Sequence, residues 1–339
     1  MKPSISDQMK TGQPVDNHFL KIPLFHDAHM HFMVNGHQAN LDDYSPLARE
    51  YLSRGILSVV DMGHKSGLGL EIKKSRHEGE WNHLRISSAG WALSKKGAYG
   101  GFLGKGITGE KEIKTAINDL TLAGVDFIKI INSGIVSFRE NDRVAEGCFS
   151  KEDWKIIREE ADRHHLKIRC HANTDRSIRQ AIISGVSSIE HGFFVSQETL
   201  REMAEKDISW TPTASALMSI KSFLPEEGQR HLDQIMDNHL KAVYYGASIG
   251  VKLQVGTDSG AKGVKPGESF FKELQLFKKA GLSLGQIVSA ACLPREEIEG
   301  GNFLLVEKNF IEQERVGVVF VNGDRVTDDQ YLQSPPSDL

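Results

Sequence analysis

The sequence contains few cysteines and no long apolar run. Its 339 residues include three cysteines, Cys148, Cys170 and Cys292, which cannot pair completely and form no CxxC spacing. We therefore expect reduced thiols and a cytoplasmic protein. Residues 1–19 lack the apolar core of a signal peptide, and no apolar run approaches the ~20 residues that cross a bilayer. The sequence predicts no membrane contact.

An excess of charge of either sign is also missing. The formal net charge is −4 with histidine neutral, so we expect no electrostatic attraction to nucleic acid. With 39% hydrophobic and 25% charged residues, the composition is that of a globular protein and excludes a disordered chain or a fibre. The expected partner is therefore a small-molecule substrate, and the sequence leaves a homo-oligomer open.

What the sequence does have is a repeated alternation of short apolar runs and amphipathic stretches. Strand–helix alternation predicts a parallel sheet, and eight units is the number that closes a barrel. We therefore predict an α/β protein built on a (β/α)8 TIM barrel. The eight predicted strands are Leu24–His29, Ile56–Asp61, Leu84–Ala89, Val125–Ile131, Lys167–His171, Ser188–His191, Ile208–Pro212 and Lys252–Thr257. Helices are predicted over Glu110–Ala123, Lys151–His165, Asp175–Ser184, Gln197–Glu205 and Glu226–Ser248.

Beyond the barrel the pattern changes to short extended segments. Ser283–Cys292 is predicted to be helical, whereas Asn302–Val306 and Val316–Val326 are predicted to be strands, with Asn322-Gly323 as a turn. We predict a small, reduced β appendage formed from the chain termini. The predicted boundaries are an N-terminal segment over 1–23, the barrel over 24–293, and a C-terminal β appendage with its tail over 294–339.

Two histidines stand at the end of the first predicted strand. In an extended strand residues i and i+2 point to the same side, so His29 and His31 can reach one metal ion. This pair alone is weak evidence, because the chain has 14 histidines. The alternative is two polar residues at a strand end.

Further metal-binding side chains stand at the ends of other predicted strands. His171 ends the fifth strand, His191 the sixth and Asp258 the eighth. In a barrel the carboxyl ends of the strands form one rim, where active sites are found. Four histidines and an aspartate on that rim suit zinc or a similar metal. Taken alone, Asp258 could instead cap the turn before Ser259-Gly260.

Lys129 lies inside a hydrophobic predicted strand. A buried, unpaired ammonium is costly, and such lysines shift toward the neutral form. Lys129 could pair with a buried acid such as Asp61 or Glu190. Alternatively, a neutral Lys129 could react with carbon dioxide to give a carbamate, which resembles a carboxylate and could bridge two metal ions.

Taken together, these motifs resemble a known enzyme superfamily. HDAHMH, FIKI, CHAN, IEHG and GTDSG are similar to the motifs of the amidohydrolase superfamily, above all its imidazolonepropionase-like and prolidase-like branch. The stretch from Cys170 to Thr213 follows that branch almost continuously, and the resemblance spans about His26 to Gly260. Members of this branch build a β-sandwich from their terminal segments. Because only about two dozen residues precede His26, we expect that domain to be reduced.

The resemblance implies a binuclear metal site. It places His29 and His31 with Asp258 on one ion and His171 with His191 on the other, bridged by carbamylated Lys129. The expected cofactor is one or two divalent ions, with Zn2+ first and Mn2+, Fe2+ or Co2+ as alternatives.

The resemblance also implies a metal-dependent hydrolase. A metal-bound hydroxide would attack an amide, a peptide-like bond (dipeptide or N-acyl amino acid), a cyclic amide or a lactone, with Asp258 as the catalytic general acid–base. A mononuclear deaminase of the same superfamily would not need Lys129. The third hypothesis is a catalytically silent metal-binding homologue, which is disfavoured because all six positions are filled.

Loop residues beyond the strand ends are expected to contact the substrate. The candidates are Tyr99, Asn132 and Asn173. Tyr99 lies in the glycine-rich stretch Gly97–Gly106, which we interpret either as a loop that covers the substrate or as an exposed surface loop.

Overall fold

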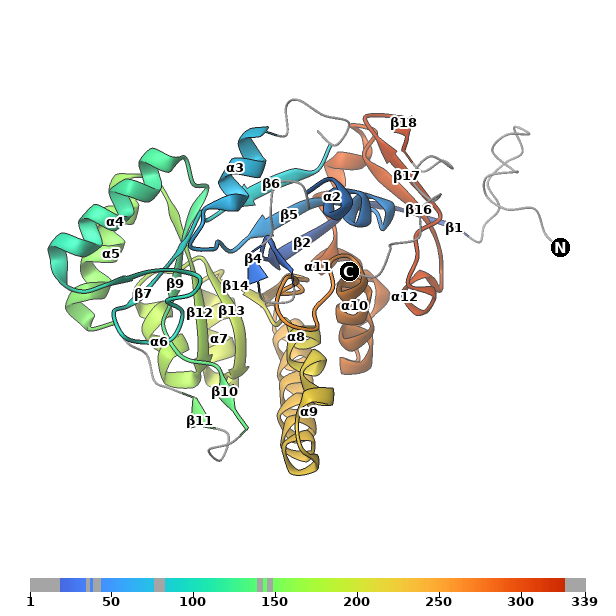
Figure 1. Cartoon of the computed structure of the whole chain (residues 1–339). Helices are drawn as coiled ribbons and strands as arrows, with labels where there is room; N and C mark the ends of the chain where they lie inside the picture. The colour runs from blue at the N-terminus through green and yellow to red at the C-terminus, as the bar shows by residue number, and fades with distance from the viewer. Residues whose placement is uncertain are drawn as a thin grey trace.

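The computed structural model describes residues 19–34, 37–38, 44–75, 83–138, 143–144 and 149–326. Every predicted strand is present, at times shifted by a few residues, and the strands alternate with helices (Figure 1). They are β2 (Phe25–Met30), β5 (Ile56–Asp61), β6 (Arg85–Ser88), β9 (Phe127–Ile131), β12 (Lys167–Thr174), β13 (Ser188–Phe194), β14 (Ser209–Thr211) and β15 (Lys252–Leu253).

Two parallel sheets close into the predicted barrel. One has the order β2-β5-β6, and the other contains β15-β14-β13-β12-β9. At one seam the amide of Ala28 donates to the carbonyl of Val255 at 2.9 Å. At the other seam the amide of Asp126 donates to the carbonyl of Ser88 at 3.0 Å. The carboxyl ends of all these strands therefore share one rim, which confirms the expected fold class.

Two strands of the second barrel sheet were not predicted, nor were two short antiparallel pairs, β3 (Met33–Val34) with β4 (His37–Gln38) and β10 (Val136–Ser137) with β11 (Arg143–Val144). β7 (Ala92–Lys95) and β8 (Gly104–Ile107) extend the second sheet beyond β9, so Gly97–Gly106 is only partly a loop. The physical reason is a close backbone approach. A Cβ atom on Gly104 would lie 1.8 Å from the carbonyl oxygen of Ala92, so only glycine permits this pairing.

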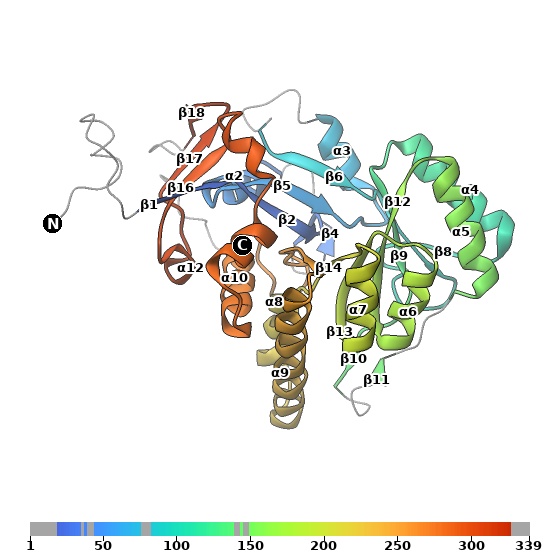
Figure 2. The ribbon, with the colours of Figure 1, turned by 180° about the vertical axis from the view of Figure 1, so that it is seen from behind.

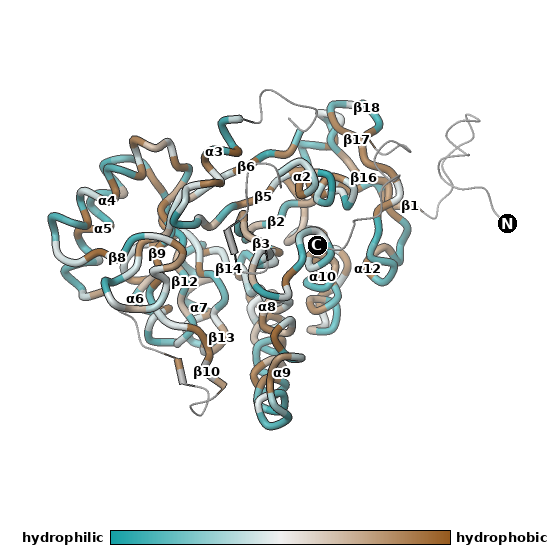
Figure 3. The backbone as a smooth tube through the Cα atoms, viewed as in Figure 1, coloured by the Kyte–Doolittle hydropathy of each residue, from teal (hydrophilic) through white to brown (hydrophobic). Residues whose placement is uncertain are grey.

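Helices cover the outside of the barrel. α4, α5, α6 and α7 flank the side of β9, β12 and β13, and α9 projects beyond the barrel (Figures 1 and 2). The outer end of α9 is hydrophilic (Figure 3). The bounds are α2 (Tyr44–Ser53), α3 (Leu68–Ser75), α4 (Gly109–Ala123), α5 (Lys151–Arg163), α6 (Asp175–Ile183), α7 (Gln197–Glu205), α8 (Ala214–Ser219), α9 (Glu226–Ser248), α10 (Glu268–Ala280), α11 (Leu284–Ala291) and α12 (Phe310–Gln313).

The two ends of the described chain meet in one antiparallel sheet, as expected for the small appendage. Its strands are β1 (Phe19–Pro23), β16 (Phe303–Glu307), β17 (Val318–Val321) and β18 (Asp324–Arg325), in that order. This sheet lies on the opposite side of the barrel from α4 and α5 (Figure 2). The predicted turn at Asn322-Gly323 is present, and both residues adopt positive φ.

A continuous core joins the appendage to the barrel. The ring of Phe25 in β2 lies 5.1 Å from that of Phe270 and 5.9 Å from that of Phe310 in α12. Cys170 and Cys292 are free thiols, and Cys148 lies outside the described residues. Among the helices of the described residues, none is long and apolar enough to cross a bilayer.

Candidate metal and substrate site

The six predicted metal ligands lie in or after five different strands and line one cavity of about 220 Å³. Five of them are buried, and the side chain of Asp258 is 21% exposed. Two lie in or directly after β2, Asp258 lies beyond β15, and the others lie in β9, β12 and β13. The barrel rim therefore assembles these side chains from distant parts of the sequence.

His29, His31 and Asp258 form a compact group. The Nε2 atoms of His29 and His31 lie 3.4 and 3.3 Å from Asp258 Oδ1. One side-chain atom of each residue lies within 4.8 Å of those of the other two. Ligand atoms about 2 Å from one tetrahedral zinc ion stand roughly 3.3 Å apart, so the donor set and its spacing fit a single ion.

Hydrogen bonds behind this group fix the orientation of both imidazoles. His29 Nδ1 lies 2.8 Å from Glu190 Oε2, and His31 Nδ1 lies 2.8 Å from the carbonyl oxygen of Gly63. Because a carbonyl oxygen only accepts, His31 donates from Nδ1. In both residues Nε2 is then the nitrogen left for a metal. Histidines that bind a metal commonly donate their other ring N–H to such an acceptor, which fixes the orientation of the ring.

Glu190 is the acid that holds His29, and it was not predicted in this role. It also accepts from Arg169 Nε at 2.9 Å and from Ser188 Oγ at 2.8 Å. Burial opposes its ionisation, but Arg169 and Lys129 hold the pKa of this carboxyl well below its usual range. Glu190 is therefore an ionised carboxylate that already has partners for both of its oxygens.

Lys129 does not pair with the buried acids proposed for it. Its side chain is 2% exposed, and among the described residues Nζ has no hydrogen-bond partner. Asp61, the other candidate, accepts from Ser88 Oγ at 2.6 Å and from the amide of Gly63 at 3.2 Å. Burial lowers the pKa of Lys129 to about 8, although Glu190 acts to raise it. The ammonium is therefore easily deprotonated and unsatisfied.

The other two histidines lie side by side, with their ring centroids 4.5 Å apart. His191 Nδ1 lies 2.7 Å from Thr213 Oγ1, and His171 Nε2 donates to the carbonyl of Gly134 at 3.2 Å. Burial, followed by the charge of Lys129, lowers the pKa of His171 to about 3. Burial also holds the pKa of His191 well below its ordinary value. Both rings are neutral, which is the form that binds a metal.

Three residues of the site adopt a strained backbone. His191, Thr213 and Asp258 have φ values of 69°, 48° and 57°, in the left-handed region that disfavours residues other than glycine. Glu273 of α10 stabilises the strained backbone at Thr213. It is fully buried and accepts from the amides of Ala214 and Ser215 at 2.9 and 2.6 Å. Glu273 thereby fixes the start of α8 next to the residue that orients His191.

Asp27 performs a similar task on the other side of the site. It accepts from the amide and hydroxyl of Thr257 at 3.0 and 2.7 Å and from the amide of His29 at 3.2 Å. These bonds tie β2 to the segment that carries Asp258. The motif that contains Asp27 was visible in the sequence, but its partner is 230 residues away.

Two of the three expected substrate contacts line the cavity. The ring of Tyr99 lies 5.7 Å from that of His171, and the amide of Asn173 donates to the carbonyl of Gly134 at 2.9 Å. Asn132 is not among the described residues that line the cavity. Its side-chain amide donates to the carbonyl of Ser177 and to Gln180 in α6, and its contact with substrate stays a prediction.

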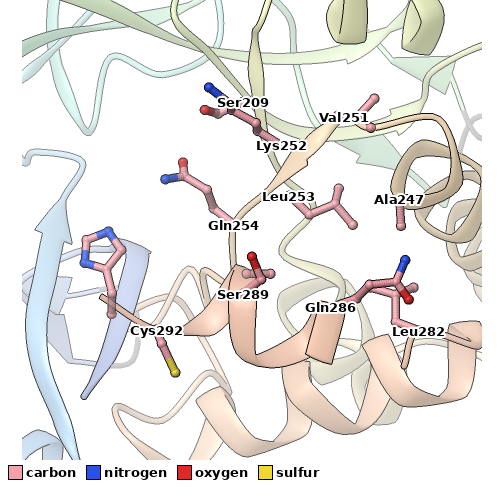
Figure 4. Close-up of a pocket in the computed structure, with 13 residues that line it drawn as sticks. Ser209, Ala247, Val251, Lys252, Leu253, Gln254, Leu282, Gln286, Ser289 and Cys292 are labelled. Atoms are coloured by element: carbon pink, nitrogen blue, oxygen red, sulfur yellow. The ribbon is translucent and has the colours of Figure 1, made fainter. Parts of the chain in front are cut away.

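A larger cavity of about 470 Å³ lies away from these residues. Its lining includes Ser209 and Lys252, the first residues of β14 and β15, together with Gln286 and Ser289 of α11 (Figure 4). It therefore lies at the amino ends of the strands. The six predicted ligands stand at or near the opposite ends, so this cavity is separate from the rim.

Comparison with known proteins agrees with this architecture. Ochratoxinase of Aspergillus niger is 28% identical over 311 residues, which cover 80% of this chain and 63% of the fungal protein, so the chain spans less than two thirds of that relative. An uncharacterized protein of Mycobacterium tuberculosis is 22% identical over 278 residues, covering 80% of this chain and 72% of that one.

Solved structures share the fold. A Xaa-Pro dipeptidase with bound methionine in its active site superposes with a TM-score of 0.75 at 22% identity, covering 92% of this chain and 87% of the other. The structure of A. niger ochratoxinase gives a TM-score of 0.71 at 23% identity, covering 90% and 82%. The model of the amidohydrolase family matches residues 20–294, which include all eight predicted barrel strands. The chain belongs to the amidohydrolase family.

Proposed function

We propose that the protein is a metal-dependent hydrolase that cleaves an amide bond. The observation that carries this proposal is the position of Lys129: a buried amine without a hydrogen-bond partner among the described residues, in a cavity lined by four histidines and an aspartate. A carbamate on Nζ would replace the unsatisfied ammonium with an anionic ligand. This donor set fits two divalent ions better than one.

The residues divide between two positions. His29, His31 and Asp258 would hold one ion, His171 and His191 the other, and carbamylated Lys129 would bridge them. When bound, such ions lower the pKa of water and polarise a substrate carbonyl. The names of the relatives, an ochratoxinase and a Xaa-Pro dipeptidase, support hydrolysis of an amide bond.

Asp258 is suited to move the proton. Burial opposes its ionisation, but hydrogen bonds from His29 and His31 hold its pKa well below the usual range, so it is a carboxylate at neutral pH. Its partial exposure to the cavity lets it take a proton from attacking water and deliver it to the leaving nitrogen. Tyr99 and the apolar walls around it would limit the access of bulk water.

The test combines metal analysis with hydrolysis. The protein is stripped with EDTA, reloaded with Zn2+ or Mn2+, and assayed on dipeptides, N-acyl amino acids, cyclic amides and lactones. We expect two metals per chain, a mass increase of one carbon dioxide that is absent in Lys129→Ala, and hydrolysis that falls at least ~100-fold in Asp258→Asn. One metal per chain, together with ammonia release from an aminopurine that Lys129→Ala leaves unchanged, would instead identify a deaminase. A metal-loaded protein that hydrolyses none of these compounds would be a silent homologue.

A further inference from the structure

His239 is a buried histidine that the proposed function does not use. It lies in α9 with no exposed surface, and its Nε2 lies 3.1 Å from the carbonyl oxygen of Pro212. Because a carbonyl oxygen only accepts, Nε2 carries the proton and donates. Nδ1 has no hydrogen-bond partner among the described residues. Burial lowers the pKa of His239 to about 4, so the ring is neutral at neutral pH.

The surroundings of His239 would suit an apolar side chain. The ring of Phe193 lies 4.9 Å from that of His239, and the ring of Trp210 lies 5.5 Å from it, both edge to face. A phenylalanine would keep these contacts and would leave no buried nitrogen without a partner, which is an unfavourable state. The contact that a phenylalanine would lose is the hydrogen bond to Pro212. A histidine at this position therefore indicates that this hydrogen bond has a role.

The hydrogen bond fixes a peptide plane beside Thr213. β14 ends before Pro212, so the carbonyl of Pro212 lies beyond the strand ladder. That carbonyl and the amide of Thr213 belong to one planar peptide unit, and its orientation sets the φ of Thr213, which is 48°. Glu273 holds the next peptide unit through the amide of Ala214. The planes on both sides of Thr213 are therefore held, one by His239 and one by Glu273.

Thr213 in turn contacts a predicted metal ligand. Its Oγ1 lies 2.7 Å from Nδ1 of His191. When Nδ1 donates to this hydroxyl, Nε2 of the neutral ring keeps its lone pair and is the nitrogen left for a metal ion. Trp210 donates from Nε1 to the carbonyl of His191 at 2.9 Å and so holds the backbone of this residue. The freedom that remains to His191 is the rotation of its ring, which Thr213 limits.

Building on the two-ion site of the proposed function, we infer that His239 is a positioning residue for His191. It holds the peptide unit of Pro212 so that Oγ1 of Thr213 accepts from Nδ1 of His191. The ring of His191 then presents Nε2 to the ion that it shares with His171. The ligands proposed for the other ion have different hydrogen-bond partners. Loss of the hydrogen bond from His239 should therefore weaken mainly one of the two ions.

Metal titration tests this inference. EDTA-stripped protein is titrated with Zn2+ against a competing chelator in bicarbonate buffer, and His191→Ala identifies the dissociation constant that belongs to the ion of His171 and His191. His239→Phe keeps a ring but removes the donor. It should weaken this ion by about three- to tenfold, less than the roughly 10- to 100-fold typical of a direct partner of a ligand. His239→Gln places an amide nitrogen near the position of Nε2 and should restore most of the affinity. His231→Phe, earlier on the same helix, is the control and should match the wild type.

A double-mutant cycle shows whether His239 acts through Thr213. Thr213→Val removes the hydroxyl and keeps the branched shape, and it should lower the same affinity by about 10- to 100-fold. In that background His239→Phe should have no further effect, because the hydroxyl that His239 positions is already missing. A general loss of packing would instead add to the effect of Thr213→Val.

Nitrogen NMR of the metal-free protein with labelled histidines gives a readout that needs no metal ion. His191→Ala again identifies the signals of His191. We expect the ring of His191 to carry its proton on Nδ1 in the wild type and in His239→Gln. In His239→Phe and Thr213→Val the proton should be divided between the two nitrogens, because the acceptor is displaced or missing.

The outcomes separate this inference from the proposed function. The inference is overturned if His239→Phe leaves the tautomer of His191 unchanged, or if its effect adds to that of Thr213→Val. It is also overturned if two ions bind and His239→Phe weakens both equally or leaves both within about twofold of the wild type. If the wild type binds one ion but the tautomer changes as expected, His239 positions His191 and the proposed two-ion site is wrong.

Discussion

Replacing Glu273 with glutamine should change how the free energy of unfolding depends on pH. Burial raises the pKa of Glu273 from 4.5 to about 7, although the amides of Ala214 and Ser215 act to lower it. Between these pKa values the folded protein keeps a proton that the unfolded chain has lost. The resulting stabilisation is fully present below pH 4.5 and is lost as the pH rises through 7.

The size of this effect follows from the two pKa values. One pKa unit corresponds to about 1.4 kcal/mol, so the full effect is about 3 kcal/mol, of which about 2.5 kcal/mol falls between pH 5 and pH 8. Glutamine does not titrate. The free energy of unfolding of Glu273→Gln minus that of the wild type should therefore rise by about 2.5 kcal/mol over this range. Asp27, whose pKa is also raised to about 7, is present in both proteins and largely cancels.

Urea unfolding of the metal-free proteins, followed by circular dichroism at pH 5, 6, 7 and 8, measures this difference. Glu268→Gln on the same helix is the matched control. A hydrogen bond from Lys272 lowers the pKa of Glu268. The free energy of unfolding of Glu268→Gln minus that of the wild type should therefore not rise with pH. The reasoning is refuted if the difference for Glu273→Gln stays constant within ~0.5 kcal/mol or falls as the pH rises.

Two further substitutions test the neighbourhood of the predicted metal ligands. Burial lowers the pKa of Lys129 to about 8, so its charged form destabilises the metal-free fold below that pH. Lys129→Met should be more stable than the wild type by about 3 kcal/mol at pH 7 and by only about 1 kcal/mol at pH 10. Urea unfolding measures both differences. A variant that is less stable than the wild type at pH 7 would contradict this prediction. Glu190→Gln keeps the shape but removes the charge beside His29, so metal affinity in a chelator competition should fall about 10- to 100-fold. An unchanged affinity would show that Glu190 does not act through His29.

The barrel could be predicted because each of its strands is a short apolar run between amphipathic helices. β7 and β8 could not be predicted in this way. Their pairing depends on the missing side chain of Gly104, and a glycine-rich stretch has no hydrophobic period to indicate a strand. The antiparallel appendage was predicted from the turn at Asn322-Gly323, but its pairing with β1 joins residues almost 300 positions apart.

For the site, strand periodicity and the shared rim indicated which side chains could converge. They did not indicate which buried groups pair behind them. The sequence suggested Glu190 as an ion-pair partner of Lys129. In the structure, Glu190 instead forms hydrogen bonds with His29, 161 residues away, and with Arg169. The roles of Thr213 and Glu273 could not be predicted. The first depends on a strained backbone, and the second depends on a helix that the strand count does not position. Local patterns thus indicated which side chains line the cavity but not the hydrogen bonds that orient them.

The buried acids of the barrel divide according to whether they have a cationic or imidazole partner. Glu190 has Arg169 and His29, and Asp258 has His29 and His31, so both stay ionised at neutral pH. Asp27 and Glu273 have only neutral hydrogen-bond donors, and burial raises the pKa of each to about 7. Glu190 and Asp258, which contact the predicted metal ligands or are among them, therefore do not titrate near neutrality, whereas Asp27 and Glu273, which hold the backbone around them, do. Rising pH through 7 therefore deprotonates Asp27 and Glu273 and destabilises the fold, while Glu190 and Asp258 keep their charge, and Glu273→Gln should remove one of these two contributions.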